Sequence, residues 1–117
     1  MPIVTVEIVD GDGAAAGVAA ALADRVGEAL AAPPGSVWVK VRRVEASAYA
    51  ENCPAPEPLP VFVHVLARVG AAAPAQQAAR IAAAVAQVVG RPRERVHVIY
   101  EPDASGRVFF GGMPDPR

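Results

Sequence analysis

The sequence predicts an α/β protein (α+β in some schemes), in which two β-α-β units form one four-stranded sheet with both helices on one face. Three observations support this prediction. Apolar runs typical of strands alternate with segments of helical periodicity, and the order strand, helix, strand occurs twice. A composition of 53% apolar and 20% charged residues is that of a globular protein, and 117 residues is the length of one domain.

A constant offset reveals the internal repeat. Pairs of identical residues lie 59 positions apart without a gap: Gly11 and Gly70, Pro33 and Pro92, Val37 and Val96, and Val39 and Val98. Glycine and proline are less common than alanine or valine here, so chance is a poor explanation for their shared register. We infer a single domain, 1–117, made of repeats 2–50 and 60–112. The proline-rich connector between them favours an extended, non-helical chain.

The first unit begins with residues 2–9, whose apolar and β-branched side chains predict a strand that ends before the sequence Asp-Gly-Asp-Gly. Residues 14–31 contain no proline and carry apolar side chains at four-residue spacing, which predicts an amphipathic helix. Pro33-Pro34-Gly35 ends it. Residues 36–44 alternate valine with larger or charged side chains, the pattern of a strand with one buried face.

The second unit repeats this order. We expect a strand over 60–70, a helix over 74–90 that Pro74 opens, and a strand over 95–100. Residues 102–112 predict a turn followed by a short apolar hairpin arm, and residues 113–117 a frayed end.

The predicted layers leave one face of the sheet uncovered. Strands joined by a helical crossover run parallel, with a right-handed connection, so each unit places its helix on the same face. Strands as apolar as VTVEIV and VFVHVL would not leave their other face in water. We therefore expect a homo-oligomer.

Charge and cysteine content exclude several classes of protein. The net charge of −1 comes from 11 basic and 12 acidic residues scattered along the chain, so neither nucleic acid nor a membrane is an expected partner. Cys53 is the only cysteine, and the chain has neither a signal-peptide pattern nor an apolar run of about 18 residues. These features predict a cytoplasmic protein. No spacing of cysteine, histidine and carboxylate residues indicates a metal site.

Pro2 is the first candidate catalytic residue. Removal of Met1 would leave a free secondary amine at the start of a strand, and an α-amino group has a pKa of about 7.7–8.0. Alternation places Pro2 on the face of Val4, Val6 and Ile8, where desolvation would favour the neutral amine, a competent general base. The alternative is an ordinary strand start that tolerates proline.

A duplicated β-α-β chain with proline after methionine resembles the tautomerase superfamily, typified by 4-oxalocrotonate tautomerase. The length is similar to that of malonate semialdehyde decarboxylase, cis-3-chloroacrylic acid dehalogenase and macrophage migration inhibitory factor. Met1-Pro2-Ile3, APPGSVWV, RPRERVHV and the terminal FFGG carry the resemblance. It implies a trimer with sites near subunit boundaries, a small-molecule substrate, no metal or organic cofactor, and the proline nitrogen as acid and base.

The resemblance also implies substrate contacts. Arg68 matches a substrate-binding arginine of the two-unit members, and arginine suits planar carboxylates; the alternative is a solvated charge at a strand end. Tyr49 resembles a tyrosine of the dehalogenase-like members, or it anchors a hinge. The remaining substrate-binding candidates, each of which could instead pack in an interface, are Trp38, His97, Arg107 and Phe109.

The chain also departs from the family pattern. Asp12, Trp38 and Ala71 stand where members carry arginines, which weakens the case for a dicarboxylate substrate. The favoured expectation is a cofactor-independent keto-enol tautomerase, an isomerase acting on a small 2-oxo or enol acid. One alternative is a decarboxylase or a hydratase/dehalogenase on the same scaffold, although the extra carboxylates of the hydratases have no clear equivalent. The other is a non-catalytic ligand-binding or assembly protein, which retention of Met1 would favour because Pro2 nitrogen would then be an amide.

Overall fold

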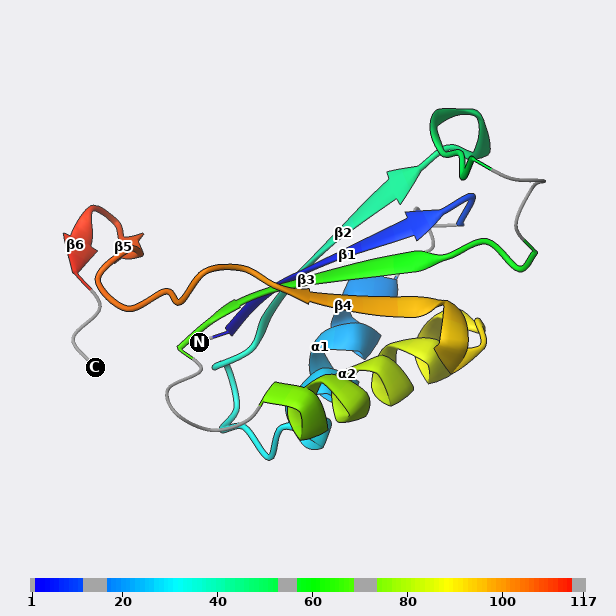
Figure 1. Ribbon diagram of the computed structural model, residues 1–117. Helices are drawn as coiled ribbons and strands as arrows, with labels where there is room; N and C mark the ends of the chain where they lie inside the picture. Colours follow the sequence, from blue (N-terminus) through cyan, green and yellow to red (C-terminus); the bar gives the residue numbers. More distant parts are fainter. Residues whose placement is uncertain (1, 12–16, 53–56, 69–73, 115–117) are drawn as a thin grey trace.

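The computed structural model describes residues 2–11, 17–52, 57–68 and 74–114. Figure 1 shows a sheet with both helices on one side of it and a small hairpin that projects beyond the sheet. The elements, in chain order, are β1 (Pro2–Val9), α1 (Val18–Ala29), β2 (Trp38–Val44), the 3₁₀ helix η1 (Ala46–Ala48), β3 (Val61–Ala67), α2 (Pro74–Val89), the 3₁₀ helix η2 (Arg93–Arg95), β4 (Val96–Tyr100), β5 (Phe109–Phe110) and β6 (Met113–Pro114).

The four long strands form one mixed sheet in the order β2-β1-β3-β4. Within each unit the two strands are parallel, as their helical crossovers require, and the units meet through the antiparallel pair β1 and β3. This pair aligns Pro2 with Ala67 and Ile8 with Val61. The predicted fold class is confirmed: a sheet of four strands has two helices on one face.

The core lies between the sheet and the helices. Alternate residues of the two central strands point toward the helices, and each helix contributes a stripe at the expected spacing. Fully buried members of this core are Val4, Val6, Val61, Val63, Val65, Leu22, Val26, Ile81 and Val85. Alanine fills much of the helix surface, so these few larger side chains supply most of the apolar volume.

Several predicted boundaries shift. The first helix is expected over 14–31, and α1 spans Val18–Ala29. Residues 14–16 of that prediction lie outside the described residues. The second strand starts two residues late, at Trp38. The prediction of a frayed end is wrong at Met113 and Pro114. These residues form β6, which pairs with β5 to make the second strand of the hairpin.

Both helices end in the same way, at positions related by the 59-residue offset. Ala31 has a left-handed φ of 50° and Gly90 one of 71°. After α1, the N–H groups of Ala31 and Ala32 donate to the carbonyls of Glu28 and Gly27, the pattern of a Schellman cap. This cap directs the chain after α1 toward the beginning of β1. Among the described helices, none is long and apolar enough to cross a membrane.

Candidate active site

Pro2 and Arg68 lie together at one end of the sheet. Pro2 opens β1 and is paired with Ala67, the last residue of β3, so Arg68 follows directly beside it. Both line a cavity of about 280 Å³. Two residues that the sequence analysis selected separately are thus neighbours because β1 and β3 are antiparallel.

The turn that follows α1 forms the apolar wall of this cavity. The wall consists of Leu30, Ala31, Ala32 and Pro33, with Ala67 from β3. The polar residues of the lining are Arg68, Ser36 and Gln77, and the Ser36 hydroxyl donates its proton to the carbonyl of Pro33 at 2.6 Å. Among the described lining residues none is acidic, so Arg68 is the one formal charge there. The cavity therefore suits an anion with a small apolar part.

Sequence reasoning missed Gln77. It lies on α2 and lines the cavity, and the hydroxyl of Tyr100 donates a hydrogen bond to its Oε1 at 2.6 Å. Burial raises the pKa of Tyr100 above its ordinary value, so the hydroxyl keeps its proton over a wide pH range. A polar side chain near the start of an otherwise alanine-rich helix was the available signal, but its orientation depends on how α2 docks on the sheet.

Asp103 contributes charge near Arg68. The segment after β4 continues beside β3, where the N–H of Ala104 donates to the carbonyl of Ala67 at 3.1 Å. The N–H of Ser105 donates to Asp103 at 2.9 Å and holds the pKa of that carboxyl below its ordinary value, and the charge of Arg68 acts in the same direction. The charge of Arg107 lowers the pKa of Asp103 as well, so this carboxyl lies near two arginines, Arg68 and Arg107.

Arg107 lies on the opposite, helix-free face of the sheet. It lines a separate hollow of about 380 Å³, together with Lys40, His64 and Glu101. His64 forms a hydrogen bond with Glu7 at 2.9 Å, and its Nδ1 lies 3.5 Å from a carboxylate oxygen of Glu101. These contacts give His64 a structural role on this face.

Trp38 and Phe109 also lie away from the Pro2 cavity. Trp38 pairs with Ile3 across the sheet and is 49% exposed; its indole N–H donates to the carbonyl of Gly35 at 3.0 Å. Its ring packs edge-on against Phe110, with the centroids 5.4 Å apart. Phe109 is 58% exposed on the hairpin.

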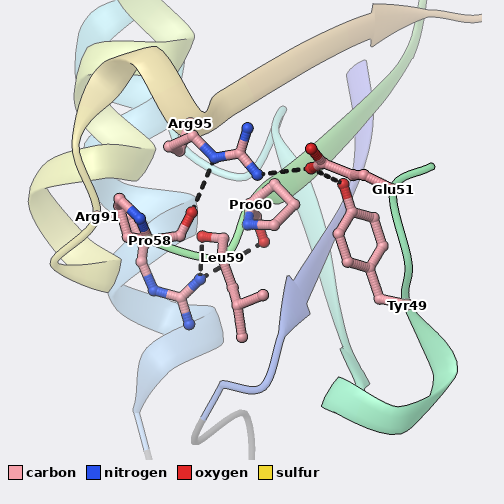
Figure 2. Close-up of polar contacts among 7 residues, drawn as sticks. All are labelled: Tyr49, Glu51, Pro58, Leu59, Pro60, Arg91 and Arg95. Atoms are coloured by element: carbon pink, nitrogen blue, oxygen red, sulfur yellow. Dashed lines mark hydrogen bonds and ion pairs between the residues drawn. The ribbon is translucent and has the colours of Figure 1, made fainter. Parts of the chain in front are cut away.

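Tyr49 and His97 lie toward the end of the sheet opposite Pro2. Figure 2 shows the Tyr49 hydroxyl and the Arg95 guanidinium both directed at Glu51, at 2.5 and 2.8 Å. The hydrogen bond from Arg95, with a smaller contribution from Tyr49, lowers the pKa of Glu51, while the hydrogen bond to Glu51 raises the pKa of Tyr49. The Phe62 ring lies against both Tyr49 and His97, with centroid distances of 5.8 and 5.6 Å.

Comparisons with known proteins give matches among solved structures. No protein-family description and no curated protein matches the chain. A fused 4-OT, described as a symmetric trimer, is 18% identical with a TM-score of 0.73 over 95% of this chain and 93% of that one. N1, a member of the cis-3-chloroacrylic acid dehalogenase family, is 24% identical with a TM-score of 0.70 over 97% and 83%. Macrophage migration inhibitory factor from Oncomelania hupensis is 21% identical with a TM-score of 0.67 over 98% and 83%.

The chain therefore has the tautomerase superfamily fold. The resemblance seen in the sequence is confirmed at this level, over nearly the whole chain. Of the departures from the family's arginine pattern, Trp38 is exposed on the helix-free face, whereas Asp12 and Ala71 lie outside the described residues. Across the described part of the tautomerase fold, no group of three histidine, cysteine or carboxylate residues could hold a metal ion.

Proposed function

We propose that this chain is a tautomerase superfamily enzyme that interconverts the keto and enol forms of a small 2-oxo acid, with Pro2 as general base and acid. The observation that carries this proposal is the shared cavity of Pro2 and Arg68. Its apolar wall disfavours a charged ammonium, which keeps an amine neutral near pH 7 once Met1 is removed.

The reaction needs only a proton carrier and a cation. Pro2 nitrogen takes a proton from the carbon next to the ketone, the C–H electron pair becomes the C=C bond, and the ketone electron pair moves to oxygen. The protonated nitrogen then returns the proton to the enolate oxygen to give the enol, and the reverse sequence ketonises it. Arg68 binds the carboxylate and holds the reacting carbon near the nitrogen.

The proposal includes a homotrimer. The fused 4-OT that shares this fold is described as a symmetric trimer. The helix-free face of this chain carries half-exposed apolar side chains, including Trp38 and Ile99 at 49% and 42% exposure, which burial against other copies would cover. In such an assembly a neighbouring subunit supplies the aromatic residues that lie outside the Pro2 cavity of one chain. Size-exclusion chromatography with light scattering measures the subunit number, and a monomer at micromolar concentration would contradict this part.

The test of the activity begins with the intact mass of the purified protein, which is expected to lack Met1. Ketonisation of phenylenolpyruvate, followed by absorbance, should fall by about 10²-fold or more in Pro2→Ala. Pro34→Ala is the control, because Pro34 is exposed and does not line this cavity. Arg68→Met should lower kcat/KM by about 10- to 100-fold, the value of a hydrogen-bonded charge.

Three results would redirect the proposal. Equal rates for the native protein and Pro2→Ala would remove Pro2 from the chemistry, and full retention of Met1 in the native host would favour a binding protein on the same fold. Proline-dependent turnover of 3-chloroacrylate without enol turnover would favour the dehalogenase alternative, which the match to the cis-3-chloroacrylic acid dehalogenase family member at 24% identity supports.

A further inference from the structure

The Gln77 amide has a fixed orientation at the edge of the Pro2 cavity. Its Oε1 accepts the Tyr100 hydrogen bond at 2.6 Å, so the amide NH₂ is the group that Gln77 can present to a ligand. Among the described residues, nothing accepts a hydrogen bond from that NH₂. Gln77 is therefore a neutral donor in the same cavity as Pro2 and Arg68.

Tyr100 is well placed to maintain this orientation. It is paired with Val65 at the end of β4, and its ring packs against the buried core. Because burial keeps the hydroxyl protonated, the amide oxygen stays engaged and the amide does not turn its oxygen toward the cavity. Rigid elements on both sides, β4 and α2, define the position of the donor.

We propose that Gln77 binds the oxo oxygen of a small 2-oxo monocarboxylate whose carboxylate is bound by Arg68, with Tyr100 as the positioning residue. The inference rests on the proposed function and specifies its substrate class. Negative charge develops on the oxo oxygen during enolisation, and a fixed N–H donor stabilises it without solvent reorganisation.

Charge and size favour a monoanion. Arg68 is the one charged residue among the described lining residues, so this lining offers a second carboxylate no second cation, and that carboxylate would be desolvated without a partner. The volume of about 280 Å³ falls just below the range of roughly 300–1,000 Å³ found for pockets that hold drug-sized molecules. Short-chain 2-oxo acids fit this space.

The test compares the binding of three ligands of equal chain length by NMR titration: 2-oxopentanoate, pentanoate and 2-oxoglutarate. Pentanoate lacks the oxo oxygen, so the ratio of the first two dissociation constants isolates its contribution. We expect the native protein to prefer 2-oxopentanoate over pentanoate by about fivefold, the value of one neutral hydrogen bond. We also expect 2-oxoglutarate to bind more weakly than 2-oxopentanoate.

Three variants locate the effect. Gln77→Leu should remove the preference for the oxo acid, and Tyr100→Phe should reduce it while leaving pentanoate binding unchanged. Gln76→Leu is the matched control, since Gln76 is the exposed neighbour on α2 that does not line the cavity. An unchanged preference in Gln77→Leu, or tighter binding of 2-oxoglutarate by the native protein, would overturn the inference.

The two proposals fail in distinguishable ways. Pro2→Ala should lose turnover but keep the preference for the oxo acid, because Pro2 carries the proton and does not bind the oxygen. Native protein that shows the Gln77-dependent preference without turning over enols would contradict the proposed function and support the binding inference. Turnover with no Gln77-dependent preference would contradict the binding inference alone. Thermal unfolding of each variant checks that the fold is retained.

Discussion

Arg91 ties together three parts of the chain that are far apart in sequence, and its removal gives a measurable test of the fold. It follows Gly90 at the end of α2, and its guanidinium donates to the carbonyl of Leu59 at 2.6 Å and to that of Val9 at 2.8 Å. Figure 2 shows the guanidinium beneath the connector that leads into β3. One side chain thus fixes the end of β1, the connector and the end of α2.

The cost of losing these bonds follows from their number and burial. Hydrogen bonds that involve a charged group contribute about 1.5–3 kcal/mol each. Arg91 is half-buried, so water competes for its hydrogen bonds and reduces the stability that they contribute. Its partner Val9, however, is a fully buried residue. For Arg91→Met, which keeps most of the apolar stem, we expect a loss of about 2–4 kcal/mol in the free energy of unfolding.

Urea unfolding followed by circular dichroism, at one fixed protein concentration, measures this loss. The fixed concentration matters because self-association would add to the apparent stability. Arg93→Met is the matched control, since Arg93 is an exposed arginine two residues away whose side chain forms no hydrogen bond or ion pair within the described chain. If the two variants unfold at the same urea concentration, the argument that Arg91 holds these segments together is refuted.

Two further predictions concern the cap of α1 and the cluster around Glu51. Ala31→Gly should raise the free energy of unfolding by about 0.5–1 kcal/mol in the same urea assay, because Ala31 holds a φ of 50° where glycine is unstrained; a decrease would contradict the cap geometry. Arg95 lowers the pKa of Glu51 on folding, so Glu51 stabilises the fold above its ordinary pKa of 4.5, and this contribution is lost as the pH falls through the lowered value. Glu51→Gln should therefore be less stable than the native protein at pH 7 and approach it in acid, and a constant difference across that pH range would contradict this.

The repeat was predictable because it reflects constraints on individual residues. A Cβ added to Gly11 would lie 2.0 Å from Cγ2 of Ile8, so glycine is required where β1 ends. The offset that matches Gly11 to Gly70 also carries Pro2, the first residue of β1, onto Val61, the first residue of β3. Strand order was not predictable, because alternation defines the two faces of a strand and does not identify its neighbours.

The candidate site was predictable only in part, for a related reason. Pro2 and Arg68 lie at strand ends, and the antiparallel meeting of the two units brings those ends together. Gln77 depends on the docking of a helix whose surface is mostly alanine, and no periodic pattern specifies that angle. The pairing of Tyr100 with Gln77 is likewise a tertiary contact between residues 23 positions apart, without a local signal.

Alternation also limits which predicted residues can share one site. Pro2 belongs to the helix-facing series of β1, whereas its neighbour Ile3 pairs with Trp38 on the helix-free face. His97, which is paired with Phe62, lies on that same face. Arg107 lines the hollow on that face. Rotating a side chain does not carry it through a sheet, so neither Trp38 nor His97 can reach the Pro2 cavity of its own chain. If they contact substrate, a neighbouring copy must present them, and a subunit mixture of Pro2→Ala with Trp38→Ala chains should then recover turnover that neither variant has alone.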